Sequence, residues 1–174
     1  MRKGKRRAAQ PHADIPALLL RLALGPMLIT HGYNKVFGSG GLEGTTKWFD
    51  GLGLQPAWLH ARLAATTEIT AGALITVGAL SPVPAAAVIG LMTTAAATDH
   101  RGKGFFIFKG GWEYVAVVGT AAAALASLGY GRFSLDHLLG RHRSGPGWAL
   151  AATAVGLGNA GALLATSYRP DEKT

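Results

Sequence analysis

Ile15–Phe37, with the sequence IPALLLRLALGPMLITHGYNKVF, decides the fold class of this 174-residue chain. The stretch is almost wholly apolar and exceeds the ~20 residues that a helix needs to cross a bilayer. Yet it carries Arg21, His31 and Lys35. An ionisable group in hydrocarbon is costly unless it is paired or faces water, so its first interpretation is functional. The stretch therefore predicts a membrane helix with a polar interior face.

Four more apolar runs approach this length, at about 57–80, 82–99, 112–129 and 147–168. Charged residues are only 15% of the chain, below the usual ~25%, and they gather at the breaks between runs. In lipid the backbone must satisfy its own hydrogen bonds, so these runs are expected to be helices. The predicted fold is an all-α, polytopic transmembrane bundle, with a four-helix core and a fifth, peripheral C-terminal helix.

The distribution of Lys and Arg predicts the orientation. Five of the first seven residues are basic, and such clusters stay on the cytoplasmic side. We expect a cytoplasmic tail at 1–14, a four-helix membrane domain at 15–138, and a linker, fifth helix and short tail at 139–174. The N-terminus is then inside, the C-terminus outside, and the first and third loops share the outer face.

Composition excludes several classes of function. The net charge of +8 does not predict nucleic-acid binding, because the basic residues flank the spans without interleaved aromatic residues. The chain has no Cys, so it offers no thiol chemistry or thiolate metal site. Its six His are scattered, and no metal site is predicted. Any electron transfer needs a bound cofactor or a partner.

The ionisable residues inside the spans are the candidate site. His31 and Lys35 are four apart and share a helical face, and Arg21 projects within about 40° of Lys35 around that helix. Glu68 comes from the next, antiparallel helix and leans toward them, which predicts a contact with His31 or Lys35. Glu68 either takes part in ligand or proton chemistry, or only neutralises a cation and fixes helix packing.

Three further segments bear on the site and the fold. Glu113 follows Gly110-Gly111-Trp112 and either complements the dipole of its helix or lies beside a ligand that the glycines allow to approach. The motif Gly156-Leu-Gly158-Asn-Ala-Gly161 matches a dinucleotide fingerprint, but it lies in an apolar run without a βαβ unit. Such small residues are more typical of close helix packing in membranes. The segment Leu42–Pro56, rich in aromatic residues, is expected at the membrane interface.

These features resemble a known family. The residues concerned are Arg21, His31-Gly32-Tyr33-Asn34-Lys35-Val-Phe, Gly53-Leu54 before Pro56, Glu68 with Gly72, Gly110-Gly111-Trp112-Glu113 and Gly131-Arg-Phe-Ser-Leu-Asp136. From about Leu18 to Leu138 the chain is similar to the DoxX family of small membrane proteins. The resemblance implies a prokaryotic plasma membrane and links to quinone-coupled oxidation. In mycobacterial members it implies a membrane complex with superoxide dismutase and a sulfurtransferase.

The resemblance implies a subunit of a quinone-linked or oxidative-stress redox complex, with no covalent cofactor. His31 or Lys35 would donate a hydrogen bond to a quinone carbonyl, and Glu68 would supply or accept the proton. Phe105, Phe106, Phe108 and Trp112 would close the pocket as a lid. Partners would be the bilayer and membrane-associated redox proteins, and whether the chain is catalytic stays open. The alternatives are a non-catalytic scaffold, docking partners through the fifth span and basic loops, and conduction of protons or small solutes.

Overall fold

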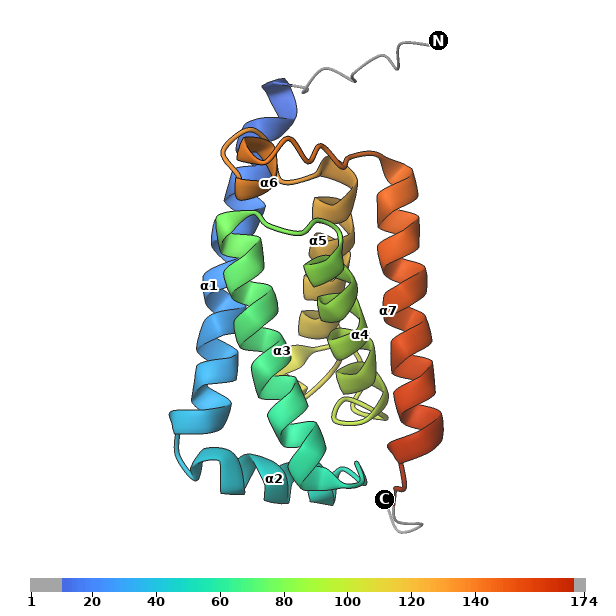
Figure 1. Cartoon of the computed structure of the whole chain (residues 1–174). Helices are drawn as coiled ribbons and strands as arrows, with labels where there is room; N and C mark the ends of the chain where they lie inside the picture. Colours follow the sequence, from blue (N-terminus) through green and yellow to red (C-terminus); the bar gives the residue numbers. More distant parts are fainter. Residues whose placement is uncertain (1–10, 171–174) are drawn as a thin grey trace.

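A computed structural model describes residues 11–170, which form helices and no strand (Figure 1). In chain order the elements are α1 (Pro11–Phe37), α2 (Gly41–Gly51), α3 (Ala57–Val77), α4 (Val83–Ala97), the 3-10 turn η1 (Ile107–Lys109), α5 (Glu113–Leu128), the short α6 (Leu135–Leu138) and α7 (Pro146–Ser167). All five predicted apolar runs thus form helices. The first one begins at Pro11, four residues before the predicted span.

The five long helices lie side by side and alternate in direction, with α2 lying across one end of the bundle (Figure 1). Residues 38–56 and 98–112 connect helices at this α2 end, and residues 78–82 and 129–145 connect them at the opposite end. The first and third loops therefore share one end, as predicted. The helix in Gly41–Gly51 was not predicted, because the sequence indicated only an interfacial segment there.

Glycines let the helices approach closely, as the contacts at Gly32 and Gly156 show. A Cβ added to Gly32 of α1 would lie 2.8 Å from the Ala65 carbonyl oxygen of α3 and 3.0 Å from Glu68 Cβ. A Cβ added to Gly156 of α7 would lie 2.8 Å from the Ala86 carbonyl oxygen of α4. Small residues allow this backbone proximity in helix bundles within membranes.

The fifth helix packs firmly on the bundle through one face. Ala152, Gly156 and Ala160 are buried against α4 and α5, and their spacing of four residues places them on one stripe. Gly158 and Gly161 have open space where a Cβ would be added, so they face outward. The close-packing interpretation of this glycine motif therefore applies to Gly156 alone.

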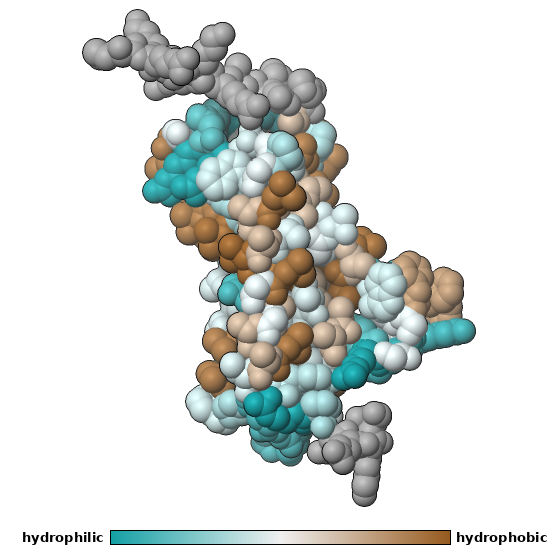
Figure 2. Space-filling view, turned by 90° about the vertical axis from the view of Figure 1, so that its right-hand side faces the viewer, coloured by the Kyte–Doolittle hydropathy of each residue, from teal (hydrophilic) through white to brown (hydrophobic). Residues whose placement is uncertain are grey.

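On the face that Figure 2 shows, apolar residues and residues of intermediate hydropathy cover the middle of the molecule, and hydrophilic residues gather mainly toward its two ends. Exposed apolar side chains occur on every long helix, including Leu19, Leu22, Leu63, Val83, Val117, Leu150 and Val155. By length and composition two helices could cross a membrane, within Ala13–Phe37 and Pro146–Ser167, whereas α4 and α5 are apolar but shorter.

Candidate functional site

Lys35 and Glu68 form a buried ion pair between α1 and α3. The Lys35 ammonium donates to both carboxylate oxygens, with Nζ 2.8 Å from Oε1 and 2.7 Å from Oε2. Only 14% of the Lys35 side chain and 6% of the Glu68 side chain are exposed. Of the two partners expected for Glu68, Lys35 is the one it contacts. An ammonium has three N–H donors, so the pair leaves one for another acceptor.

The ion pair lines a cavity of about 250 Å³ near the α2 end of the bundle. Its polar side chains are His31 and Lys35 of α1, Glu68 of α3, Thr94, Thr98, Asp99 and His100 at and beyond the end of α4, and Tyr114 of α5. Its apolar walls include Trp48, Phe49, Leu52 and Leu54 from α2 and the turn after it, together with Leu91, Met92 and Val115. The cavity is thus apolar with a few converging polar groups, as ligand sites are.

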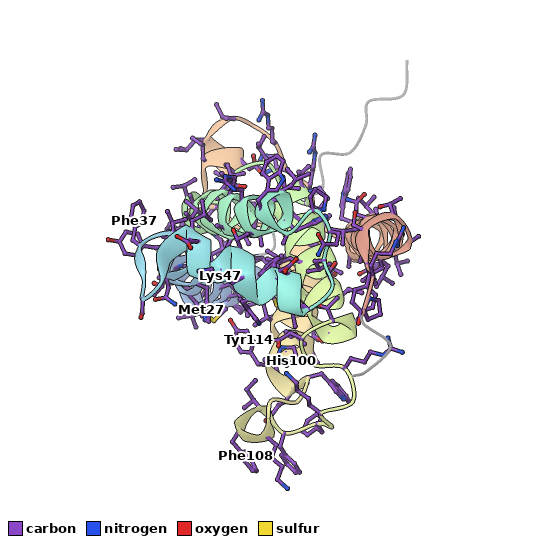
Figure 3. The ribbon with its side chains drawn as sticks, turned by 90° about the horizontal axis from the view of Figure 1, so that it is seen from below. Met27, Phe37, Lys47, His100, Phe108 and Tyr114 are labelled. Atoms are coloured by element: carbon purple, nitrogen blue, oxygen red, sulfur yellow. The ribbon has the colours of Figure 1, made fainter. Side chains whose placement is uncertain are left out.

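A second pair of polar side chains joins α1 to α5. His31 Nε2 lies 3.2 Å from the Tyr114 hydroxyl, and the two rings are tilted with centroids 5.6 Å apart. His31 is exposed while Tyr114 is half-buried, so this pair lies at the surface of the cavity. His100 Nδ1 is held 2.6 Å from the Gly110 carbonyl oxygen, and it lies beside Tyr114 when the bundle is seen from the α2 end (Figure 3).

The helix α2 closes the cavity from below. Its buried residues, Thr45 and Phe49, are four apart and face the bundle. The Thr45 hydroxyl donates to the Lys35 carbonyl oxygen at 2.8 Å, which ties α2 to the end of α1. The Trp48 ring lies 6.0 Å from Lys35 Nζ, within the range of a cation–π contact.

The structure does not bring Arg21 to this cavity. Its buried guanidinium lies toward the opposite end of the bundle and donates to four backbone carbonyls. Nε donates to Ile75 and Nη2 to Thr76, at 3.0 and 2.8 Å, and Nη1 donates to Tyr130 and Phe133, at 2.9 and 2.7 Å. Arg21 therefore clamps the end of α3 to the turn after α5.

The turn beside this clamp is itself held by buried acidic groups. Asp136 accepts from the backbone N–H of Leu80 and Ser81, at 3.0 and 2.8 Å. Burial and the nearby Asp136 raise the pKa of Tyr130, so its hydroxyl is neutral. This end of the molecule is a structural junction between the connections at 78–82 and 129–145.

The structure does not form the predicted lid or place Glu113 in the site. None of Phe105, Phe106, Phe108 and Trp112 lines the cavity. These aromatic residues belong to a hairpin that projects sideways from the bundle, with Phe108 at its far end, away from Tyr114 (Figure 3). Glu113 begins α5 and accepts from the Ile107 N–H at 3.1 Å, so it braces this hairpin.

Sequence reasoning missed Trp48, His100 and Tyr114 as residues of the cavity. Trp48 and Phe49 were expected only at an interface, because α2 was not predicted as a helix. Its amphipathic pattern, with Thr45 and Phe49 one turn apart, was the signal that could have found it. Tyr114 directly follows Glu113, and one residue along a helix turns the side chain by about 100°. Glu113 therefore points to the hairpin, whereas Tyr114 points to the cavity.

Residues 17–101 match the family model described as DoxX. The match covers α1 to α4 and ends at the start of the aromatic hairpin, short of α5 and α7. No curated protein and no solved structure shows a significant match to the chain.

Proposed function

Because residues 17–101 of this chain belong to the DoxX family of membrane proteins, we propose that the protein is a redox-associated membrane subunit that binds a lipid-soluble carrier of the quinone class. The observation that carries this proposal is the Lys35–Glu68 pair on the wall of an otherwise largely apolar cavity. Ionisable side chains are costly to place in hydrocarbon, so those found there usually serve a function such as binding a ligand or moving a proton.

The proposed membrane arrangement uses all five long helices. The apolar surface on every one of them is what a bilayer would cover, and exposed apolar patches of this extent mark interaction surfaces. The 16 residues of α5 rise about 24 Å, less than the ~30 Å of hydrocarbon. The loop residues at its ends would complete this crossing. With the basic N-terminus inside, the cavity lies in the outer half of the membrane.

The cavity fits the head of a quinone by size and by donors. At about 250 Å³ it lies below the usual ligand-site range of roughly 300–1,000 Å³, so it suits a single ring better than a dinucleotide. A quinone carbonyl accepts hydrogen bonds, and Lys35, His31 and Tyr114 are candidate donors around this space. Trp48 and Phe49 offer aromatic surfaces for the ring.

A quinone bound here would supply the two-electron chemistry that these side chains lack. The role of Lys35 would be to donate its third N–H to a carbonyl oxygen while it remains paired with Glu68. Glu68 would hold or release a proton beside that oxygen, and His31 and Tyr114 would connect it to the surface of the cavity. The two electrons would come from a partner protein or from another bound carrier.

Fluorescence provides the test, because Trp48 is the only tryptophan that lines the cavity within the described residues. A short-chain benzoquinone should quench the purified protein, and Trp48→Phe should remove the saturable part of the quenching. Lys35→Gln should weaken binding about tenfold or more, since charge-assisted hydrogen bonds are strong. The control is Lys47→Gln, because Lys47 is an exposed lysine on α2 that pairs with Glu43.

Lys35→Gln leaves Glu68 without its cation, so loss of binding could reflect a disturbed fold. The double variant Lys35→Gln with Glu68→Gln replaces the ion pair by an amide pair of similar shape and serves as the second measurement. Binding that stays native in this double variant would contradict the proposed role of the pair. A wild-type protein that shows no saturable quenching would contradict the site itself.

The alternative function is a non-catalytic scaffold. It is favoured by the outward face of α7, where Gly158 and Gly161 leave open space beside the exposed Leu157. Such a face suits close packing of a partner's membrane helix. Gly158→Leu should abolish co-purification of partners if the scaffold function holds, and should leave quinone quenching unchanged.

A further inference from the structure

A second cavity adjoins the candidate site and lies between α3, α4 and α7. It has a volume of about 270 Å³ and a mainly apolar lining, whose polar side chains are His60, Thr67, Thr94 and Asn159. The residues found only in this cavity include Leu63 and Thr67 of α3, Ala87 and Gly90 of α4, and Leu163 of α7. We call it the α3–α7 groove.

The groove and the polar cavity share a wall. Phe49, Leu54, Ala64, Leu91 and Thr94 line both of them. Ala64 is one helical turn before Glu68, so the groove begins within about 6 Å of the ion pair along α3. The two spaces are therefore neighbours, with the charged pair in the polar cavity and mainly apolar side chains around the groove.

Small side chains explain why the groove exists. Three of the five α4 residues that line it are small, namely Ala86, Ala87 and Gly90, and α7 adds Ala160. These short side chains leave space between α3 and α7. At the α2 end a strap closes the gap, because Gln55 N donates to the Ser167 carbonyl and Arg169 N to the Gly53 carbonyl, at 2.8 and 2.6 Å. Leu63 lines the groove and is exposed, so the groove opens to the outside of the bundle at this residue.

We infer that the ligand of this protein is a single-chain amphiphile, whose polar head lies at Lys35 and Glu68 and whose apolar chain leaves through the α3–α7 groove. The inference rests on the proposed function and adds the ligand class and its route of entry. The argument for this occupant is that five residues line both spaces and that the groove begins one helical turn from Glu68. A ligand whose head and chain are joined covalently needs a polar and an apolar space side by side, whereas a separate lipid does not.

Photolabelling tests where the chain lies. The probe is a benzoquinone that carries one alkyl chain with a diazirine near its middle, added to the full chain in lipid nanodiscs. Labels on α3, α4 and α7 at groove residues, competed by the same compound without the diazirine, would support the inference. Labels confined to outward residues such as Leu19 and Leu22 of α1 would overturn it.

The second measurement is quinone binding to a variant in which a bulky side chain fills the groove. Ala87→Phe places a ring in the groove at a half-buried position, where the fold should tolerate it. It should weaken binding of the chain-bearing quinone about tenfold and leave a chainless benzoquinone unaffected. The matched control is Ala151→Phe, on the exposed side of α7. Equal affinity of Ala87→Phe and wild type for the chain-bearing probe would overturn the inference.

Failure of the inference can be told from failure of the proposed function. If the chainless quinone binds in a Lys35-dependent way but the chain labels other surfaces, only the route is wrong. If neither quinone binds, the proposed function and the inference are both overturned.

Discussion

Gly32 and Glu68 are in contact across the α1–α3 interface, and this contact sets the position of the ion pair. A Cβ on Gly32 would lie 3.0 Å from Glu68 Cβ, so α1 approaches α3 closely at this level. Lys35, three residues further along α1, then reaches both carboxylate oxygens. The Lys35–Glu68 ion pair therefore depends on the close approach of the two helix backbones at Gly32.

Gly32→Ala should consequently destabilise the protein by about 1–3 kcal/mol, because the added methyl group overpacks the interface and moves α1 away from α3. Thermal unfolding in detergent measures this. Gly158→Ala is the matched control, since it has open space and gains helix propensity of up to ~1 kcal/mol. Equal stability of Gly32→Ala and wild type would mean that the two helices are not held at this distance.

Glu68→Gln and Glu68→Leu should differ in stability. The glutamine removes the counter-charge but keeps shape and a hydrogen-bond acceptor for Lys35, so insertion should stay close to native and the melting temperature should fall less than with leucine. The leucine leaves a buried ammonium unpaired, which costs about 3–5 kcal/mol in comparable cases. A Glu68→Leu protein that melts with the wild type would show that water reaches Lys35.

Arg21→Lys should destabilise the bundle by about 3 kcal/mol or more, because a lysine cannot serve the four carbonyls that the guanidinium holds. Quinone quenching by the folded fraction should be unchanged, since Arg21 lies away from the cavity. Arg62→Lys is the control, because Arg62 is exposed and donates to the Trp58 carbonyl one turn away. A loss of quinone affinity in Arg21→Lys without loss of stability would contradict the structural role.

Reporters fused near Gly140 and after Thr174 should lie on opposite sides of the membrane, the first cytoplasmic and the second outside. The alternation of the five long helices requires opposite sides, and the basic N-terminus sets the direction. Alkaline phosphatase and green fluorescent protein fusions distinguish the two compartments. Both positions on one side would rule out five crossings.

The sequence predicted the helices and the Lys35–Glu68 contact well, because both follow from local rules. Apolar runs of this length have few alternatives to helix, and residues four apart share a face. The grouping of Arg21 with His31 and Lys35 was wrong, because a helical projection gives the direction of a side chain around the helix axis but not its position along that axis. Fourteen residues separate Arg21 from Lys35 by about 21 Å along the helix, which is about half the length of α1.

The prediction of an aromatic lid over the cavity was wrong for a different reason. Phe105, Phe106 and Phe108 lie in a loop, and the direction in which a loop leaves a helix depends on turns that periodicity does not encode. Here backbone bonds from Trp112 to Gly104 and from Glu113 to Phe105, at 3.1 and 2.9 Å, close the loop on itself. The hairpin therefore holds its own rings together and carries them outward.

That outward hairpin has a consequence for how the molecule sits in lipid. Its exposed rings are accompanied by Arg101, Lys103 and Lys109, and in the proposed membrane arrangement this mixture of aromatic and basic side chains would lie at the level of the headgroups. The hairpin would thereby fix the height of the bundle relative to one leaflet. In thicker or thinner bilayers the mismatch would then fall on the opposite end, beside the Arg21 junction, while the proposed groove between α3 and α7 would keep its depth.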